Sequence, residues 1–85
     1  MTKLQQFIKN KPYLIWYTKN YDNLSEKAIA ESIFNYGNWE DYNFLESSLG
    51  INKLNNIFNE LKNQKRVNLG PQTINYFSNY FKAYA

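Results

Sequence analysis

The stretch GNWEDYNFLESSLGINKLNNIFNEL, residues 37–61, decides the fold class of this chain. Gly37 and Gly50 bracket one amphipathic segment, and Gly50 opens a second one. Apolar side chains recur three and four residues apart in both segments, which is the spacing of a helix that buries one face. They are Trp39, Tyr42, Leu45 and Leu49 in the first segment, and Leu54, Ile57, Phe58 and Leu61 in the second. The stretch predicts two helices joined by a tight glycine turn, with Trp39 as a core anchor.

The residues around these two segments predict where the helices begin and end. We expect Asn38 to cap the first helix and Asn52 to cap the second. We expect Gly37 to end the preceding helix in the left-handed conformation. Glu40 and Asp41 lie in a first turn, where the helix dipole favours negative charge. Because neighbouring helical side chains point about 100° apart, these carboxylates are interpreted as dipole partners and not as an acid–base pair.

Helical patterns continue on both sides of this central pair. A preceding helix ends near Gly37, with Asn23 and Ser25 as competing caps and Ile29, Ile33 and Tyr36 as its stripe. Pro71 suits the first turn of a final helix, where apolar residues repeat to residue 84. That final stripe consists of Ile74, Phe77, Tyr80, Phe81 and Tyr84.

The N-terminal segment is predicted to differ from the rest. Residues 2–10 fit one short helix at most, which the Lys11–Pro12 pair stops because a residue before proline avoids the helical region. The aromatic run that follows is interpreted as an extended arm across the bundle. Its expected buried residues are Leu14, Ile15 and Trp16.

No strand pattern competes for any segment, so the predicted fold class is all-α. We expect a small bundle of four principal helices with a helix-turn-helix-like central pair and an N-terminal aromatic arm. The chain of 85 residues is expected to form a single domain. Residues 1–22 would supply the short helix and the arm, and residues 23–85 the helical core.

Composition argues against catalysis. The chain has no cysteine and no histidine, which removes disulfides, thiolate chemistry, the commonest general base and the commonest metal ligand. Neither a glycine-rich phosphate loop nor a metal-ligand spacing occurs. We therefore expect no enzyme activity, no cofactor and no metal. No apolar run approaches the ~20 residues of a membrane span, and the start lacks the features of a signal peptide, so we expect a soluble, cytoplasmic protein without a membrane partner.

The surplus of aromatic residues favours a protein partner. Two Trp, eight Tyr and six Phe exceed what a core of this size easily encloses. Trp and Tyr also anchor protein interfaces. We expect a partly exposed aromatic patch built from the arm and the last helix. The candidate partner-binding residues are Tyr13, Trp16, Tyr17, Tyr21, Tyr76, Tyr80 and Tyr84.

DNA binding is the alternative, because the second central helix resembles a recognition helix. Its outward side is rich in Asn and Lys, which read adenine and meet phosphate or guanine. The candidate nucleic-acid-binding residues are Lys53, Asn55, Asn56, Asn59, Lys62, Lys65 and Arg66. The acidic residues Glu40, Asp41 and Glu46 on the helix before it would repel a phosphate backbone. Plain bundle packing is therefore the favoured interpretation of the central pair. The oligomeric state stays open.

Three blocks of the chain resemble a family of small bacterial proteins over roughly residues 12–81. The blocks are YLIWYTKNYDNLS, IFNYGNWEDYNFLESSLGINKL and NLGPQTINYFSNYF. The residues that match are Ile15, Trp16, Gly37, Trp39, Glu40, Asp41, Tyr42, Leu45, Leu69, Thr73, Tyr76, Ser78 and Phe81. The sequence departs from the family pattern at six positions. Tyr17, Thr18 and Lys19 stand where acids are usual, and Leu49 stands where an aromatic residue is usual. Gly70 and Gln72 replace the usual Asp and basic residue.

Members of this family are often encoded beside an abortive-infection-type nucleotidyltransferase toxin and are regarded as its antitoxin. The resemblance implies a binding protein with no catalytic residues to carry over. It implies a toxin as the protein partner, with promoter DNA as a second ligand.

Overall fold

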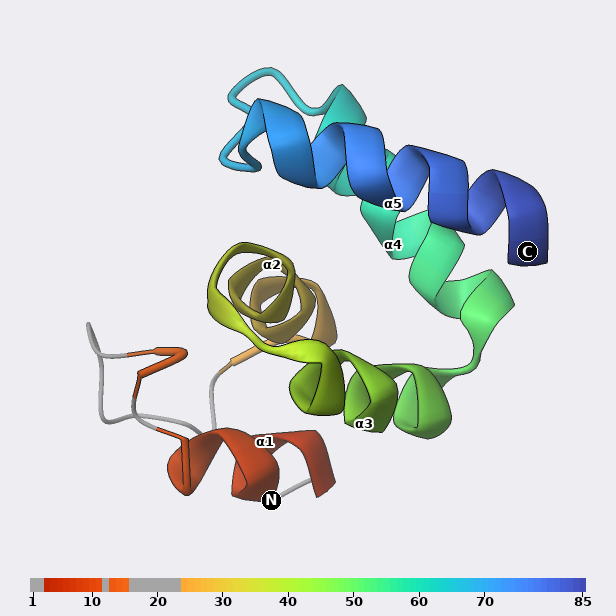
Figure 1. Cartoon of the computed structure of the whole chain (residues 1–85). Coiled ribbons are helices and arrows are strands. Elements are labelled where there is room, and N and C mark those ends of the chain that lie inside the picture. The colour runs from red at the N-terminus through yellow and green to blue at the C-terminus, as the bar shows by residue number, and fades with distance from the viewer. Residues whose placement is uncertain (1–2, 12, 16–23) are drawn as a thin grey trace.

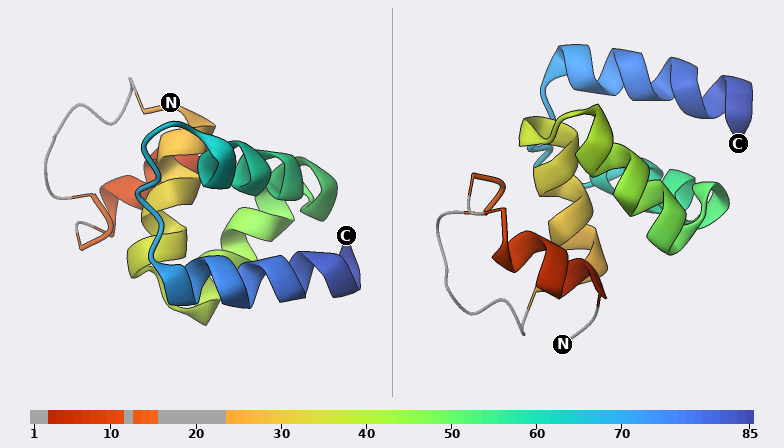
Figure 2. Two further views of the ribbon diagram at one scale, coloured as in Figure 1. Left: turned by 90° about the horizontal axis from the view of Figure 1, so that it is seen from above. Right: turned by 60° about the horizontal axis from the view of Figure 1, so that its bottom comes forward.

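The computed structural model describes residues 3–11, 13–15 and 24–85. These residues form five α-helices and no strand, which confirms the predicted all-α class. The helices are α1 (Lys3–Lys9), α2 (Glu26–Tyr36), α3 (Trp39–Leu49), α4 (Ile51–Asn63) and α5 (Pro71–Tyr84). In Figure 2 the loop of residues 64–70 reverses the chain, so that α5 runs back in the direction opposite to α4.

Helix α2 is the central element. Figure 1 looks along α2, with α1 and α3 below it and α4 and α5 above, and α2 contacts α1, α3 and α4. Its N-cap is Ser25, whose hydroxyl accepts a 3.1 Å hydrogen bond from the Ala28 amide. The competing cap, Asn23, lies outside the described residues. The prediction that Tyr36 belongs to the buried stripe of α2 is wrong. Tyr36 lies in the last turn of the helix and is 55% exposed.

The turn from α2 to α3 confirms one predicted cap and corrects the role of a glycine. Asn38 caps α3 by accepting a 2.9 Å hydrogen bond from the Asp41 amide, and Asp41 Oδ2 accepts one of 3.1 Å from the Asn38 amide. Gly37 has φ −76° and ψ 156°, which is extended and not left-handed. What requires glycine here is space, because an added Cβ would lie 2.7 Å from the carbonyl oxygen of Ile33.

The joint between α3 and α4 is a single residue. Gly50 ends α3 and serves as the N-cap of α4, with φ 85° and ψ 148°. The predicted cap at Asn52 is wrong, because the helix already begins at Ile51 and places Asn52 inside its first turn. A DNA-binding helix-turn-helix uses a turn of about three to four residues, longer than this joint.

One apolar core joins all five helices. The Phe34 ring of α2 makes edge contacts with Phe58 of α4 and with Phe77 and Phe81 of α5, at centroid distances of 5.5, 4.7 and 6.3 Å. These rings link the last helix to the centre of the fold.

The described part of the arm also belongs to the core. Leu14 and Ile15 are fully buried, which confirms that part of the prediction, whereas Trp16 lies outside the described residues. Beside them, Phe7 of α1 stacks on Phe44 of α3 with a centroid distance of 4.2 Å. Within the ranges described here, no helix combines the length and apolar character needed to cross a membrane.

Candidate functional site

Helix α5 presents a row of tyrosines along the edge of its buried face. Phe77 and Phe81 point into the core. Tyr76, Tyr80 and Tyr84 follow one another in steps of four residues, so they share one face of the helix. Tyr76 is 54% exposed and Tyr84 is 68% exposed, whereas Tyr80 between them is half-buried. The structure thus brings together the three predicted residues of the last helix.

Trp39 joins this row, although the sequence predicted it as a core anchor. The indole is 50% exposed, so that prediction is wrong. Trp39 is the first residue of α3, where no further turn of helix covers it. Its ring stacks on Tyr42 at a centroid distance of 5.2 Å and meets the Tyr80 ring edge-on at 5.9 Å. Trp39 therefore lies over the core and extends the tyrosine row onto α3.

These rings line an open groove of about 500 Å³. Two amides of α5 complete the lining. The lining residues are Trp39, Asn75, Tyr76, Asn79, Tyr80 and Tyr84. None of them carries a charge. The groove is therefore an aromatic surface with amide and hydroxyl hydrogen-bonding groups along it.

A carboxylate beneath the groove fixes two of its rings. Oε1 of Glu46 accepts hydrogen bonds from the hydroxyls of Tyr80, at 2.8 Å, and Tyr42, at 3.0 Å. Burial raises the pKa of Tyr42 far above its ordinary value, and the hydrogen bond to Glu46 raises it further. The pKa of Tyr80 is also raised, mainly by desolvation and then by its hydrogen bond to Glu46. Both phenols stay neutral donors near pH 7, so Glu46 ties α3 to α5.

Tyr13 has a different setting from the tyrosines of α5. It is 46% exposed, does not line the groove, and donates a 2.6 Å hydrogen bond to Oδ2 of Asp41. That bond raises the pKa of Tyr13 to about 12, with smaller contributions from desolvation and the charge of Asp41. Lys11 Nζ lies 3.7 Å from Oδ1 of the fully buried Asp41. Tyr13 thus fastens the arm to α3. The other predicted arm residues, Trp16, Tyr17 and Tyr21, lie outside the described residues.

The residues of the DNA-binding alternative are spread around α4 and the loop after it. Lys53 Nζ forms a 2.8 Å ion pair with Oε2 of Glu26, and Lys62 Nζ lies 5.6 Å from the centroid of the Phe58 ring. Lys65 and Arg66 are exposed in the loop. The remaining predicted residues are the exposed Asn56 and the half-buried Asn55 and Asn59. Of these asparagines only Asn56 is exposed to solvent, and Asn55 and Asn59 lie at the edge of the buried face of α4.

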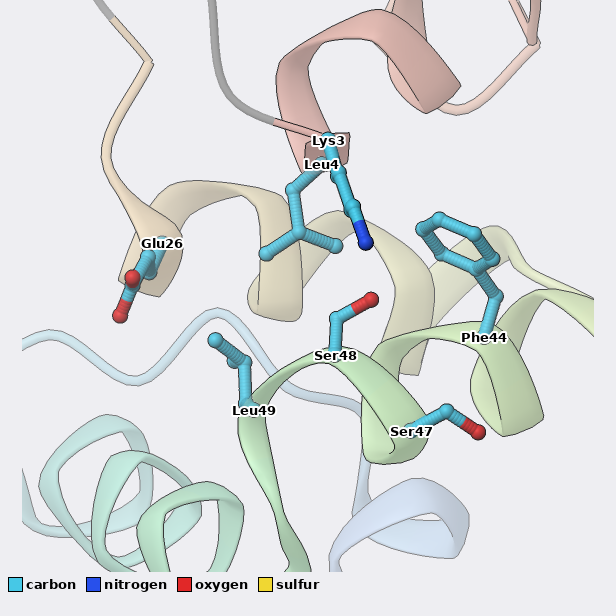
Figure 3. Close-up of a pocket in the computed structure, with 7 residues that line it drawn as sticks. All are labelled: Lys3, Leu4, Glu26, Phe44, Ser47, Ser48 and Leu49. Carbon is cyan, nitrogen blue, oxygen red and sulfur yellow. The ribbon is translucent and has the colours of Figure 1, made fainter.

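A second hollow of about 390 Å³ lies between α1, the start of α2 and the end of α3 (Figure 3). Its walls combine the apolar Leu4, Phe44 and Leu49 with polar groups. In Figure 3 the side chains of Lys3 and Ser48 point toward one another across it. Glu26 at its edge is already paired with Lys53. This hollow has a polar rim and lacks the row of exposed rings that marks the groove.

Comparison with family models, curated proteins and solved structures yields no match. The functional interpretation therefore rests on the residues that line the groove and on their contacts.

Sequence reasoning missed four residues of the site: Trp39, Glu46, Asn75 and Asn79. The i, i+3, i+7 spacing of Trp39, Tyr42 and Glu46 places them on one side of α3. Asn75 and Asn79 precede Tyr76 and Tyr80 by one residue each. These patterns were visible in the sequence, but only the packing of α3 against α5 shows that they meet.

Proposed function

We propose that this chain is a non-catalytic binding protein that engages a partner protein through the groove between Trp39 and α5. The observation that carries the proposal is the row of exposed rings in a groove whose lining residues are all uncharged. Contiguous exposed apolar surface on a small protein marks an interaction site more often than chance. Trp and Tyr are also the residues most enriched at binding hot spots.

The rigidity of the groove supports the same function. Tyr80 is held by Glu46, and Trp39 is stacked on the buried Tyr42. Side chains that are already ordered lose little conformational entropy on association, whereas a free side chain loses the equivalent of about 0.5–1.5 kcal/mol. A partner therefore meets a surface that is largely organised in advance.

The resemblance described from the sequence names the class of partner. It implies an antitoxin that neutralises a nucleotidyltransferase-type toxin. Stoichiometric neutralisation needs a binding surface and no catalytic group, and the groove supplies such a surface. The matched residues Trp39 and Tyr76 of the family blocks both line it.

Co-expression with a nucleotidyltransferase toxin encoded beside this gene, followed by a pull-down, tests the proposal. We expect a complex with the wild-type chain that Tyr76→Ala and Tyr84→Ala each weaken by about tenfold or more. Tyr36→Ala is the matched control, because Tyr36 is as exposed as Tyr76 (55% against 54%) and does not line the groove. Equal losses in all three variants, or no complex with the wild-type chain, would contradict the proposal.

DNA binding through α4 is the second candidate, favoured by the exposed Asn56 on α4 and the exposed Lys65 and Arg66 after it. It predicts a complex with upstream DNA that weakens steeply with salt, since each neutralised phosphate releases counterions. Replacing Lys62, Lys65 and Arg66 by Ala would abolish that complex while leaving the toxin complex intact. A gel shift that is unchanged by the triple substitution would remove this candidate.

A further inference from the structure

We propose that the groove binds a proline-rich segment of the partner in the extended polyproline II conformation. This inference rests on the proposed function and specifies which part of a partner the groove takes. It follows from the charge, the hydrogen-bonding groups and the length of the groove.

Charge complementarity comes first. All six lining residues are uncharged, and the nearby Glu46 carboxylate already accepts two tyrosine hydroxyls. A strongly charged ligand, such as a nucleic acid backbone or an acidic peptide, would be desolvated in this groove without an opposite charge to meet it. The occupant that fits is an uncharged one. Proline-rich segments meet this condition and dock in aromatic-lined grooves.

The hydrogen-bonding groups favour an extended chain over a helix. The lining residues carry hydrogen-bond donors: the indole N–H of Trp39, the hydroxyls of Tyr76 and Tyr84, and the amides of Asn75 and Asn79, all on exposed residues. A polyproline II segment makes no internal hydrogen bonds, so its carbonyl oxygens are free to accept from such donors. A docked helix has already used its backbone carbonyls internally. An extended chain can use the donors along its whole length as well as the rings.

The length of the aromatic row matches a short segment of this kind. Tyr76 and Tyr84 are eight residues apart in α5, which corresponds to about 12 Å along the helix axis. Four residues of polyproline II span about the same length at 3.1 Å per residue. Tyr80 lies midway between them. Because its hydroxyl is bonded to Glu46, Tyr80 offers only its ring to a ligand. The groove is therefore sized for about four residues.

Fluorescence anisotropy with a fluorescein-labelled polyproline peptide tests the inference on the full chain. We expect saturable binding that Tyr76→Ala and Tyr84→Ala each weaken by about tenfold or more, whereas Tyr36→Ala leaves it unchanged. A glycine–serine peptide of equal length should not bind. Because the groove is uncharged, raising the salt concentration should change the affinity by less than about twofold. Far-UV circular dichroism of each variant verifies that it is folded.

The outcomes separate this inference from the proposed function. If the toxin pull-down depends on Tyr76 but polyproline does not bind, the ligand inference is overturned and the proposed function stands. If polyproline binds through Tyr76 but toxin capture is indifferent to Tyr76, the inference about ligand chemistry is supported and the proposed function fails. If sedimentation shows a dimer that Tyr76→Ala dissociates, and polyproline does not bind, a second copy occupies the groove and the inference is overturned.

Discussion

The hydroxyl of Tyr80 donates a 2.8 Å hydrogen bond to the carboxylate of Glu46, 34 residues earlier in the chain. The same oxygen atom accepts from Tyr42 of α3 at 3.0 Å. A single carboxylate thus connects a core tyrosine with a tyrosine of the groove. This arrangement makes the stability of the fold and the shape of its exposed surface depend on one side chain.

Replacing Glu46 is expected to destabilise the protein. Glu46→Ala removes the acceptor of two hydroxyls, one of them on the buried Tyr42, and should lower the free energy of unfolding by about 1–2 kcal/mol. Glu46→Gln keeps an oxygen acceptor and should have a smaller effect. Urea denaturation measures both, with Glu60→Ala as a control on the exposed side of α4 that should stay within about 0.5 kcal/mol of wild type. A loss in Glu46→Ala no larger than in this control would contradict the role assigned to Glu46.

A double-mutant cycle isolates the bond between α3 and α5. Tyr80→Phe removes only the hydroxyl and should cost about 1 kcal/mol. Because that hydroxyl and the Glu46 carboxylate act on each other, Tyr80→Phe combined with Glu46→Ala should cost less than the sum, by about 0.5 kcal/mol or more. Strict additivity of the two substitutions would show that the bond does not contribute in solution.

Alkaline pH is expected to lower the stability. The folded-state pKa of Tyr13 is raised to about 12, and the pKa values of Tyr42 and Tyr80 are also raised, from an ordinary value of about 10. Above pH 10 the unfolded chain loses these protons while the folded chain retains them, so the free energy of unfolding falls as pH rises. The contribution of Tyr13 is fully present below pH 10 and is lost by about pH 12.

Denaturant titrations at a series of pH values measure this dependence. Tyr13→Phe and Tyr42→Phe should each make the decline above pH 10 shallower, because each removes one group that titrates differently in the two states. A decline as steep in both variants as in the wild-type chain would rule out these two tyrosines as its source.

Asp41 is expected to be the most sensitive polar position in the described part of the chain. Its carboxylate completes the capping box of α3 with Asn38, accepts from Tyr13 and is fully buried, with Lys11 as its ionic partner. Asp41→Ala should cost about 2–4 kcal/mol, the combined loss of half of the capping box and of the bond to Tyr13. Tyr13→Phe removes only the bond between the two side chains and should have a smaller effect than Asp41→Ala. Thermal unfolding compares them, and hydrogen exchange at the Leu14 amide should be faster in Asp41→Ala.

The three glycines should tolerate alanine to different degrees. Gly50→Ala forces a side chain into φ 85°, which should cost about 1–3 kcal/mol although nothing lies within 4 Å of the added Cβ. Gly37→Ala brings a Cβ to 2.7 Å from the Ile33 carbonyl oxygen and should destabilise by a similar amount or more through that clash. Gly70→Ala is the control, since φ is −66° and the nearest atom is 3.9 Å away.

Thermal unfolding of the three variants measures both losses against the Gly70→Ala control. Gly70→Ala should be neutral or raise stability by up to about 1 kcal/mol, because alanine restricts the unfolded chain more than glycine does. If Gly50→Ala proved as stable as Gly70→Ala, the conformation assigned to the α3–α4 joint would be incorrect.

The helices were predictable from sequence because their apolar residues keep a helical spacing. The stripe of Leu54, Ile57, Phe58 and Leu61 is buried as expected, and Pro71 begins α5 as expected. Local chemistry also identified Asn38 as a cap, because its partner Asp41 is only three residues away. Such features depend on neighbours in the chain and are therefore visible in it.

The predictions that proved wrong or incomplete concern residues whose surroundings depend on contacts between distant segments. Trp39 has the apolar character of a core residue, but its position at the first residue of α3 leaves one side of the ring uncovered. Asp41 was expected only to complement a helix dipole, whereas Tyr13 reaches it from 28 residues away. Periodicity shows which face of a helix is apolar and does not show where the neighbouring helix ends. The groove could not be derived without that information.

The placement of Phe77 and Phe81 on α5 has a consequence for biosynthesis. Ribosomes make the chain from its N-terminus, so the rings of Phe34 and Phe58 leave the exit tunnel before the residues that cover them. Until α5 emerges, that hydrophobic face stays open to water and to other nascent chains. Assembly of the core thus waits for the same helix that carries the groove, and a chain released early would lack both.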